Sequence, residues 1–180
     1  GTGKTTVAAS LALALAIAIL QATIPLVGAQ TGRRRWMEFG TPLALTQFVA
    51  IAVSFAALMH AFITSDFSLR VVVQNSHSMK PMLYKIAGVW GNHEGSMLLW
   101  VLILAAFGAA LALFGQGLPV ALKARALSVQ ALIGVAFLAF ILFTSNPFDR
   151  LAVPPFDGRD LNPLLQDPGL AFHPPFLYFG

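Results

Sequence analysis

Four long apolar runs, separated by polar and charged stretches, dominate the pattern of this chain. The runs cover about residues 7–28, 41–64, 95–114 and 126–144. Each is close to the ~20 residues that an α-helix needs to cross a hydrocarbon core about 30 Å thick. Backbone polar groups in lipid must bond within their own segment, which favours helices. The pattern predicts an all-α, polytopic transmembrane helical bundle with four complete spans and the start of a fifth at about residue 174.

Two longer and more polar segments, 65–92 and 145–172, follow the second and fourth apolar runs. Three cations, Arg33–Arg35, fall in the short connection after the first run, and Lys123 and Arg125 fall in the short connection after the third. Short loops rich in Lys and Arg stay on the cytoplasmic side of a membrane. We therefore expect the two long segments to be outer loops, which in a bacterial inner membrane face the periplasm.

Two shorter features add detail to this outline. Val71–Val73, in the first outer loop, is a β-branched run that favours a short strand. Gly108 and Ala112 lie four residues apart in the third apolar run, and small residues at this spacing let helices approach closely inside a membrane. We expect a local strand at the first position and a close helix contact at the second.

Composition agrees with a membrane protein. Apolar residues make up 57% and charged residues 10% of the 180 residues, with a mean hydropathy of +0.77, whereas soluble domains carry about 25% charged residues. The net charge of +4 gathers in the short connections, which indicates membrane topology and no nucleic acid partner. With no cysteine, the chain alone builds no disulfide, Cys-ligated zinc site or iron–sulfur cluster. It begins without Met and ends in a helix-start pattern, so we expect a fragment.

The first six residues, GTGKTT, are half of a phosphate-binding loop. The full motif G-x-x-x-x-G-K-[ST] lies between a buried strand and a helix, and both the strand and the first glycine would precede residue 1. The pattern that follows contains no acidic metal-binding strand. A P-loop ATPase therefore stays an alternative that rests on this stretch alone, beside an N-terminal flank with no function of its own.

The candidate site lies in the last twenty residues. His173 precedes Pro174 and Pro175 and has Phe172 and Phe176 close by in sequence. Proline at 174 disfavours helix at His173, and proline at 175 suits the first turn of a helix, so we expect the imidazole to be displayed from an extended segment. An exposed neutral imidazole at an apolar, aromatic rim is what haem iron needs in an axial ligand. The alternative is an interfacial histidine at a helix start.

A second candidate group opens the third span, in the stretch WGNHEGS. Trp90 is expected at headgroup depth, Asn92 is suited to cap the helix, and Glu94 suits its positive end. His93 and Glu94 begin the zinc pattern H-E-x-x-H, but residue 97 is Met, so the second zinc ligand is missing. Trp90, His93 and Glu94 are weaker candidates for cofactor binding, and a purely structural role in capping is equally open.

Three blocks carry a resemblance to a known family. They are NSHSMKPMLYKIAGVWGNHEGSMLLWVLIL (75–104), FILFTSNPF (140–148) and DGRDLNPLLQDPGLAFHPPFLYFG (157–180). The blocks are long and rich in Trp, His, Pro and Gly, which makes coincidence implausible. Over about residues 11–180 the chain resembles the amino-terminal part of the CcmF/NrfE family of cytochrome c-type biogenesis proteins, the haem lyase subunits of bacterial cytochrome c maturation.

The resemblance implies a multi-pass inner-membrane protein that receives haem b from a haem chaperone. With other maturation subunits, it would join the haem vinyl groups to the two thiols of an apocytochrome c Cys-x-x-Cys-His motif. It implies that His173, in a periplasmic loop, ligates the haem iron axially. The family's Trp-rich loop and its other haem histidines would follow residue 180, so we expect this fragment alone to be inactive. The alternative from another class is a structural or docking membrane subunit without chemistry of its own.

Overall fold

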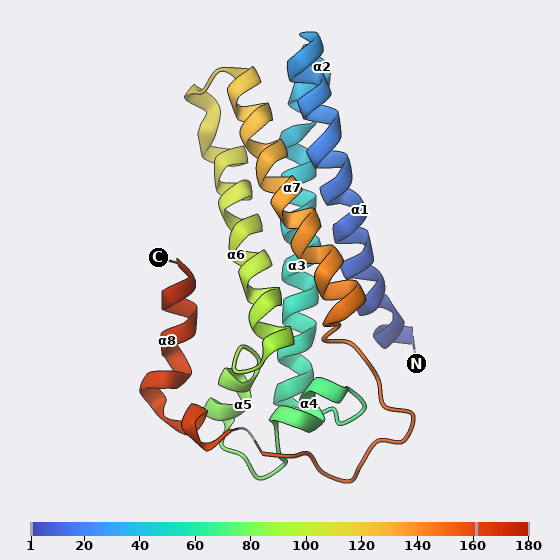
Figure 1. The fold of residues 1–180 in the computed structure, drawn as a ribbon, viewed down its shortest axis with the longest axis vertical. Coiled ribbons are helices and arrows are strands. Elements are labelled where there is room, and N and C mark those ends of the chain that lie inside the picture. The colour runs from blue at the N-terminus through green and yellow to red at the C-terminus, as the bar shows by residue number, and fades with distance from the viewer. Residues whose placement is uncertain (1, 161, 180) are drawn as a thin grey trace. The chain divides into compact units, whose positions relative to one another are not determined.

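The computed structural model describes residues 2–160 and 162–179, and the side chains of residues 2–8, 164, 165 and 170 lie outside this description. Within these ranges the structure contains helices and no strand beyond an isolated bridge between Leu69 and Arg150. The all-α fold is therefore confirmed. The elements, labelled in Figure 1, are α1 (Thr2–Thr31), α2 (Arg34–Glu38), α3 (Gly40–Ile63), α4 (Arg70–Asn75), α5 (Met82–Gly88), α6 (His93–Phe114), η1 (Gly115–Gly117), α7 (Val120–Thr144), η2 (Pro163–Gln166) and α8 (Pro168–Phe179).

Four helical segments of the described chain are long and apolar enough to cross a membrane. They are Ala9–Thr31, Arg34–Ile63, His93–Gly117 and Val120–Thr144. This confirms the expected four-span helical fold. The last of them begins six residues before the predicted run, and Lys123 therefore lies in the first turn of α7. A lysine is tolerated there because its long stem lets the charged end reach a polar partner away from lipid.

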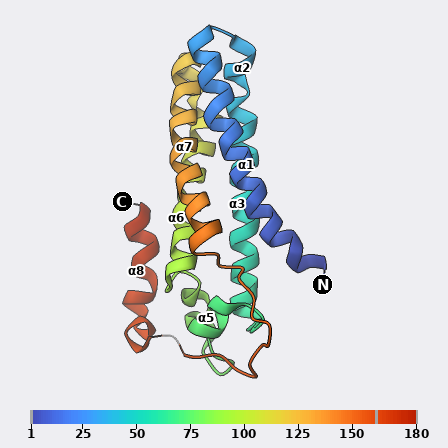
Figure 2. The same ribbon diagram turned by 45° about the vertical axis from the view of Figure 1, so that its right-hand side comes forward.

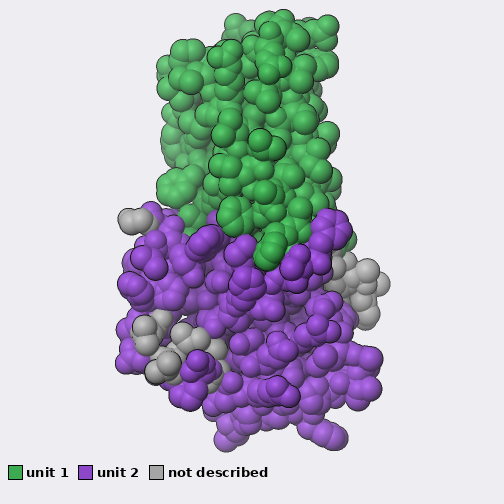
Figure 3. All heavy atoms as spheres, viewed as in Figure 1, with its two compact units in different colours: residues 1–54, 101–142 green, residues 55–100, 143–180 purple. Residues whose placement is uncertain are grey.

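The chain divides into two compact units, which Figure 3 shows in green and purple. Unit 1 comprises Gly1–Ser54 and Val101–Leu142, and unit 2 comprises Phe55–Trp100 and Phe143–Gly180. Both short connections belong to unit 1. Both outer loops, with the candidate residues of the two motifs, belong to unit 2.

Buried polar side chains connect the helices of unit 1. Gln21 of α1 donates from Nε2 to the Leu127 carbonyl (3.0 Å) and to Gln130 Oε1 (3.1 Å) of α7. Gln130 in turn donates to the Leu104 carbonyl of α6 (3.1 Å). Gly108 makes room for this network, because a Cβ at that position would lie 2.6 Å from Gln130 Oε1. The small residue expected to bring helices together thus also accommodates a glutamine.

The short connections of unit 1 hold their cations in local contacts. Arg33 lies over the ring of Trp36, 5.1 Å from its centroid, and Arg34 pairs with Glu38 at 2.9 Å. Lys123 donates to the carbonyl of Ala112 in the last turn of α6 (2.6 Å), where carbonyls lack intrahelical donors. α1 extends to Thr31, so the first connection is shorter than the apolar pattern predicted.

The prediction of a strand at Val71–Val73 is wrong, because these residues form part of α4. Val71 and Val72 are both buried, at 3% and 0% exposure. In a strand two consecutive side chains point to opposite faces, whereas on a helix neighbouring positions share a broad face. Burial of this face outweighs the weak β preference of valine in a short segment.

The half phosphate loop falls on positions that are largely outside the description. Gly1 and the side chains of residues 2–8 lie outside it. The backbone of Thr2 is already part of α1. A phosphate loop needs a non-helical turn whose N–H groups converge on an anion, and the described backbone at residues 2–6 is helical instead.

Candidate functional site

The expectation that His173 lies in an extended segment is wrong, because α8 runs from Pro168 through His173 to Phe179. The helix begins at Pro168, six residues before the predicted start of a fifth span. Pro168 suits a first helical turn, and the Ala171 N–H bonds to the Asp167 carbonyl at 2.9 Å. Pro174 and Pro175 therefore lie inside the helix, where each removes a backbone donor.

α8 has two chemically different faces. The inner face of α8 follows the helical spacing i, i+3, i+4 and i+7 and is buried or half-buried; it consists of Ala171, Pro174, Pro175 and Tyr178. The outer face of α8 is exposed and consists of Phe172, His173, Phe176, Leu177 and Phe179. The sequence correctly predicted a displayed imidazole among aromatic rings, although a helix and not an extended strand displays it.

The inner face of α8 is attached to the rest of unit 2 by two aromatic residues. The Trp90 indole donates from Nε1 to the carbonyl oxygen of Ala171, at 2.7 Å. Trp100 of α6 meets the ring of Tyr178 edge to face, with centroids 5.2 Å apart and planes at 77°. α8 also packs against α5, which lies near the start of α8 in Figures 1 and 2. Ala171, the residue that Trp90 contacts, lies two residues before His173 along the chain.

The WGNHEGS stretch forms the junction between α5 and α6. Asn92 accepts the Gly95 N–H on Oδ1 (2.7 Å), which confirms the predicted helix cap. Its amide nitrogen donates to the carbonyls of Gly88 (2.7 Å) and Val89 (3.1 Å) at the end of α5. A Cβ on Gly95 would lie 1.6 Å from the Val89 oxygen, so only glycine fits this close approach. One side chain therefore joins the end of one helix to the start of the next.

His93 and Glu94 occupy the first turn of α6, next to Trp90 in sequence. His93 is exposed and Glu94 is half-buried. Within residues 2–160 and 162–179, no cluster of three or more His, Asp or Glu side chains has the arrangement to hold a metal ion. Of the three candidates in this stretch, Trp90 contacts α8, whereas His93 and Glu94 lie at the start of α6.

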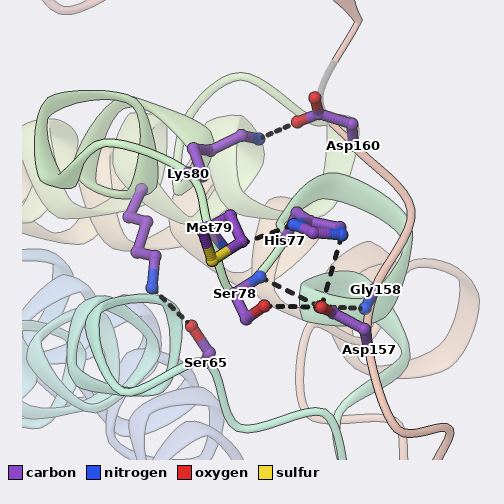
Figure 4. Close-up of polar contacts among 9 residues, drawn as sticks. Ser65, His77, Ser78, Met79, Lys80, Asp157, Gly158 and Asp160 are labelled. Atoms are coloured by element: carbon purple, nitrogen blue, oxygen red, sulfur yellow. Dashed lines mark hydrogen bonds and ion pairs between the residues drawn. The ribbon is translucent and has the colours of Figure 1, made fainter.

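A clasp joins the two outer loops around Asp157, as Figure 4 shows. Ser78 donates to this carboxylate from its backbone (2.9 Å) and its hydroxyl, and Gly158 donates its backbone N–H (2.8 Å). His77 Nε2 lies 3.3 Å from Asp157 Oδ2. The hydrogen bonds from Ser78, its hydroxyl first, hold the pKa of Asp157 down at about 2. The carboxylate is therefore ionised throughout the physiological range and ties the loops together.

Two lysines support the same loops. The side chain of Lys80 is buried and pairs with Asp160 Oδ1 at 3.1 Å, and it also donates to the Asn75 carbonyl at the end of α4 (3.1 Å). Burial lowers the pKa of Lys80, and the interaction with Asp160 opposes this shift. Lys85 donates to the Ser65 hydroxyl at 2.8 Å, a contact that Figure 4 also shows.

Several site residues were missed by sequence reasoning. The contact at Ala171 follows from a signal that was present, because consecutive prolines remove the donors to that carbonyl. The role of Gly95 had a weaker signal, a glycine in the first turn of a long helix. The clasp at Asp157 had none, since its partners are 79 residues apart along the chain.

Comparisons with known proteins identify relatives of this chain. The family model described as cytochrome C assembly protein matches residues 90–180, from Trp90 to the end of α8. The chain is 70% identical over 171 residues to the cytochrome c-type biogenesis protein ccl1 of Rhodobacter capsulatus, covering 95% of this chain and 26% of that protein. It is 48% identical to CcmF of Escherichia coli, covering 94% of this chain and 26% of the relative.

A more distant relative and a solved structure extend the comparison. NrfE of Haemophilus influenzae is 42% identical, with 94% of this chain and 27% of the relative covered. A structure described as cytochrome c heme lyase CcmF matches 99% of this chain and 28% of its own chain, with a TM-score of 0.84 and 25% identity. The chain thus spans about a quarter of the length of the relatives it matches. With the family model covering half of its residues, this chain belongs to the cytochrome c assembly protein family.

Proposed function

We propose that this chain is the haem-handling amino-terminal part of a membrane subunit that attaches haem b covalently to apocytochrome c in the periplasm, with His173 as an axial ligand of the haem iron. The observation that carries the proposal is the exposed imidazole on the outer face of α8. Relatives named cytochrome c-type biogenesis proteins, and a similar structure described as a heme lyase, support it.

The residues on the outer face of α8 fit a porphyrin. A haem needs apolar contact for its flat macrocycle and one or two nitrogen ligands for its iron. Phe172 and Phe176 lie four residues apart on the same face as His173, and the side chain of Phe176 is 75% exposed. The face thus offers aromatic surface and one imidazole together. Both belong to a helix fixed at its other face by Trp90 and Trp100.

His173 would act by holding its substrate in place. Thioether formation adds a cysteine S–H across a vinyl double bond of the haem, so no group leaves. The difficult part is to keep each vinyl carbon close to its thiol. An imidazole on a packed helix would hold the haem by its iron while the haem supplies the vinyl carbon, which would reduce the entropy lost when the thiol reaches it.

The charge distribution supports a periplasmic position for His173. The three arginines at 33–35 and Lys123 lie in the short connections after the first and third apolar runs, whereas His173 follows the long loop after the fourth run. Because cation-rich short loops stay in the cytoplasm, the outer loops would face the periplasm of the inner membrane. Apocytochrome thiols and delivered haem would reach His173 from that side.

The first experiment is haem titration of the full-length protein carrying His173→Ala. We expect the Soret band to lose the part that comes from haem held by His173, and cytochrome c maturation in cells to fall with it. His60→Ala, an exposed histidine of α3, is the matched control and should keep both. A normal Soret band and normal holocytochrome yield in His173→Ala would refute the ligand assignment.

The docking alternative has its own supporting observation. Large apolar side chains are exposed in the outer loops, with Met79 and Val153 at 85% and 83% and Phe156 fully exposed. Such side chains are suited to contact a haem chaperone, the apocytochrome or another maturation subunit. If docking were the sole role, Met79→Ser with Phe156→Ser would abolish maturation while His173→Ala left haem binding unchanged. A third outcome is that His93 of α6 is the ligand. In that case His93→Ala would lose haem and His173→Ala would keep it.

A further inference from the structure

We propose that Trp90 is a positioning residue for His173: its indole N–H replaces the backbone donor that the double proline removes from α8, and so fixes the direction in which the imidazole points. This inference rests on the proposed role of His173 as haem ligand. It concerns a residue that touches neither the iron nor the reacting atoms.

The carbonyl oxygen of Ala171 has no backbone donor within α8. In an α-helix this oxygen accepts from the N–H of the residue four positions later, and in a 3₁₀ turn from the residue three positions later. Here those residues are Pro175 and Pro174, and neither has an N–H. Because Ala171 is only 3% exposed, water has little access to the oxygen. A donor from elsewhere in the fold is therefore required.

Trp90 supplies that donor at 2.7 Å. Contacts in the junction between α5 and α6 hold Trp90 itself in place. It lies in the junction where Asn92 bonds to the ends of both α5 and α6. Gly95 permits the close approach of these helix ends. The indole thus projects from a rigid turn, which makes it suited to orient a partner.

The effect on His173 follows from the helix geometry. Without the indole N–H, the Ala171 carbonyl would turn toward other donors and rotate the peptide units that follow it. His173 is two residues further on, so the imidazole would swing with them. The Trp100 contact with Tyr178, one turn beyond the prolines, would still attach the end of α8. The expected defect is a misdirected ligand on a helix that stays folded.

The test uses Trp90→Phe in the full-length protein, which keeps an aromatic ring and removes only the N–H donor and part of the ring. We expect about tenfold weaker haem affinity, because an imidazole that points in the binding direction in only a fraction of the molecules lowers the apparent affinity by that fraction. We also expect faster amide hydrogen exchange at Phe172 and His173 in the haem-free protein. Trp36→Phe, in unit 1, is the matched control and should change neither.

A second substitution separates the hydrogen bond from ring packing. Pro175→Ala restores an N–H four residues after Ala171, so the double variant Trp90→Phe/Pro175→Ala has a backbone donor for the same oxygen. We expect haem affinity and amide protection in the double variant to return to within about threefold of the parent protein. No recovery would overturn the proposal, because it would show that the indole acts through its packing.

The outcomes distinguish this inference from the proposed function. If His173→Ala loses haem while Trp90→Phe binds haem like the parent protein, the positioning role is refuted and the ligand role stands. If His173→Ala keeps haem, both are refuted. General unfolding of unit 2 in Trp90→Phe, seen as fast exchange in α4 and α5 as well as α8, would also count against a positioning role.

Discussion

Residue 95 has to be glycine because of a single backbone atom. A Cβ there would lie 1.6 Å from the Val89 oxygen, and that oxygen belongs to backbone that no side-chain rotation moves. We expect Gly95→Ala to destabilise the full-length protein by about 3 kcal/mol, the upper end for overpacking, measured by thermal unfolding in detergent. Gly117→Ala is the matched control, because its Cβ would meet nothing within 4 Å. Equal stability of the two variants would contradict the close approach.

Single residues differ in how much of their role the sequence reveals. The cap at Asn92 was predicted correctly because a cap depends on the chemistry of one side chain and its place before an apolar run. The exposure of His173 was also predicted, but its backbone conformation was not. The rule that disfavours helix before proline rests on a steric clash between the proline ring and the preceding residue, and prolines inside a helix also leave backbone carbonyls without donors. At Ala171 the indole of Trp90 satisfies one of them, and that depends on tertiary structure.

At the scale of the helix, Gly108 and Gln130 are expected to act as a pair. Gly108→Ala brings a methyl group to 2.6 Å from Gln130 Oε1, which should displace the amide and break its bond to Leu104. We expect a loss of about 1–2 kcal/mol in the free energy of unfolding. In a Gln130→Ala background, Gly108→Ala should lower the free energy of unfolding by less, because the glutamine side chain that the methyl group would meet is absent.

The measurement is a double-mutant cycle on unfolding in detergent. Gly134→Ala serves as a comparison on the same helix as Gln130, since its Cβ would have a tight contact of 3.2 Å with Gln47 Nε2 and would not meet Gln130. Strictly additive effects of Gly108→Ala and Gln130→Ala would show that the two residues do not share a contact.

The elements that the sequence predicted well are the four long helices. Lipid leaves the backbone few alternatives there, so an apolar run of sufficient length nearly determines its structure. The short elements of the outer loops were predicted poorly. α4 is helical because two adjacent valines are buried together, and α8 begins early because of contacts with α5 and Trp90. These causes lie in distant parts of the sequence, and local pattern does not contain them.

For the molecule as a whole, the topology is open to direct measurement. The chain contains no cysteine, so in a background free of other cysteines an introduced thiol reports its own location. We expect Phe156→Cys to react with a membrane-impermeant maleimide added outside intact cells. Gln116→Cys, in the exposed η1 turn of unit 1, should react only after permeabilisation. The reverse pattern would place His173 in the cytoplasm and remove the proposed function.

The division of α8 into two faces limits how this protein can vary. A helix turns by about 100° per residue, so one residue inserted or deleted between Pro168 and His173 would rotate the histidine, together with the side chains that follow it, by about 100° relative to the start of α8. Insertions and deletions within α8 would therefore impair haem binding. The irregular stretch from Val153 to Phe156 can lengthen or shorten without changing the direction of His173. Across species, insertions should accumulate in the second region and be absent from the first.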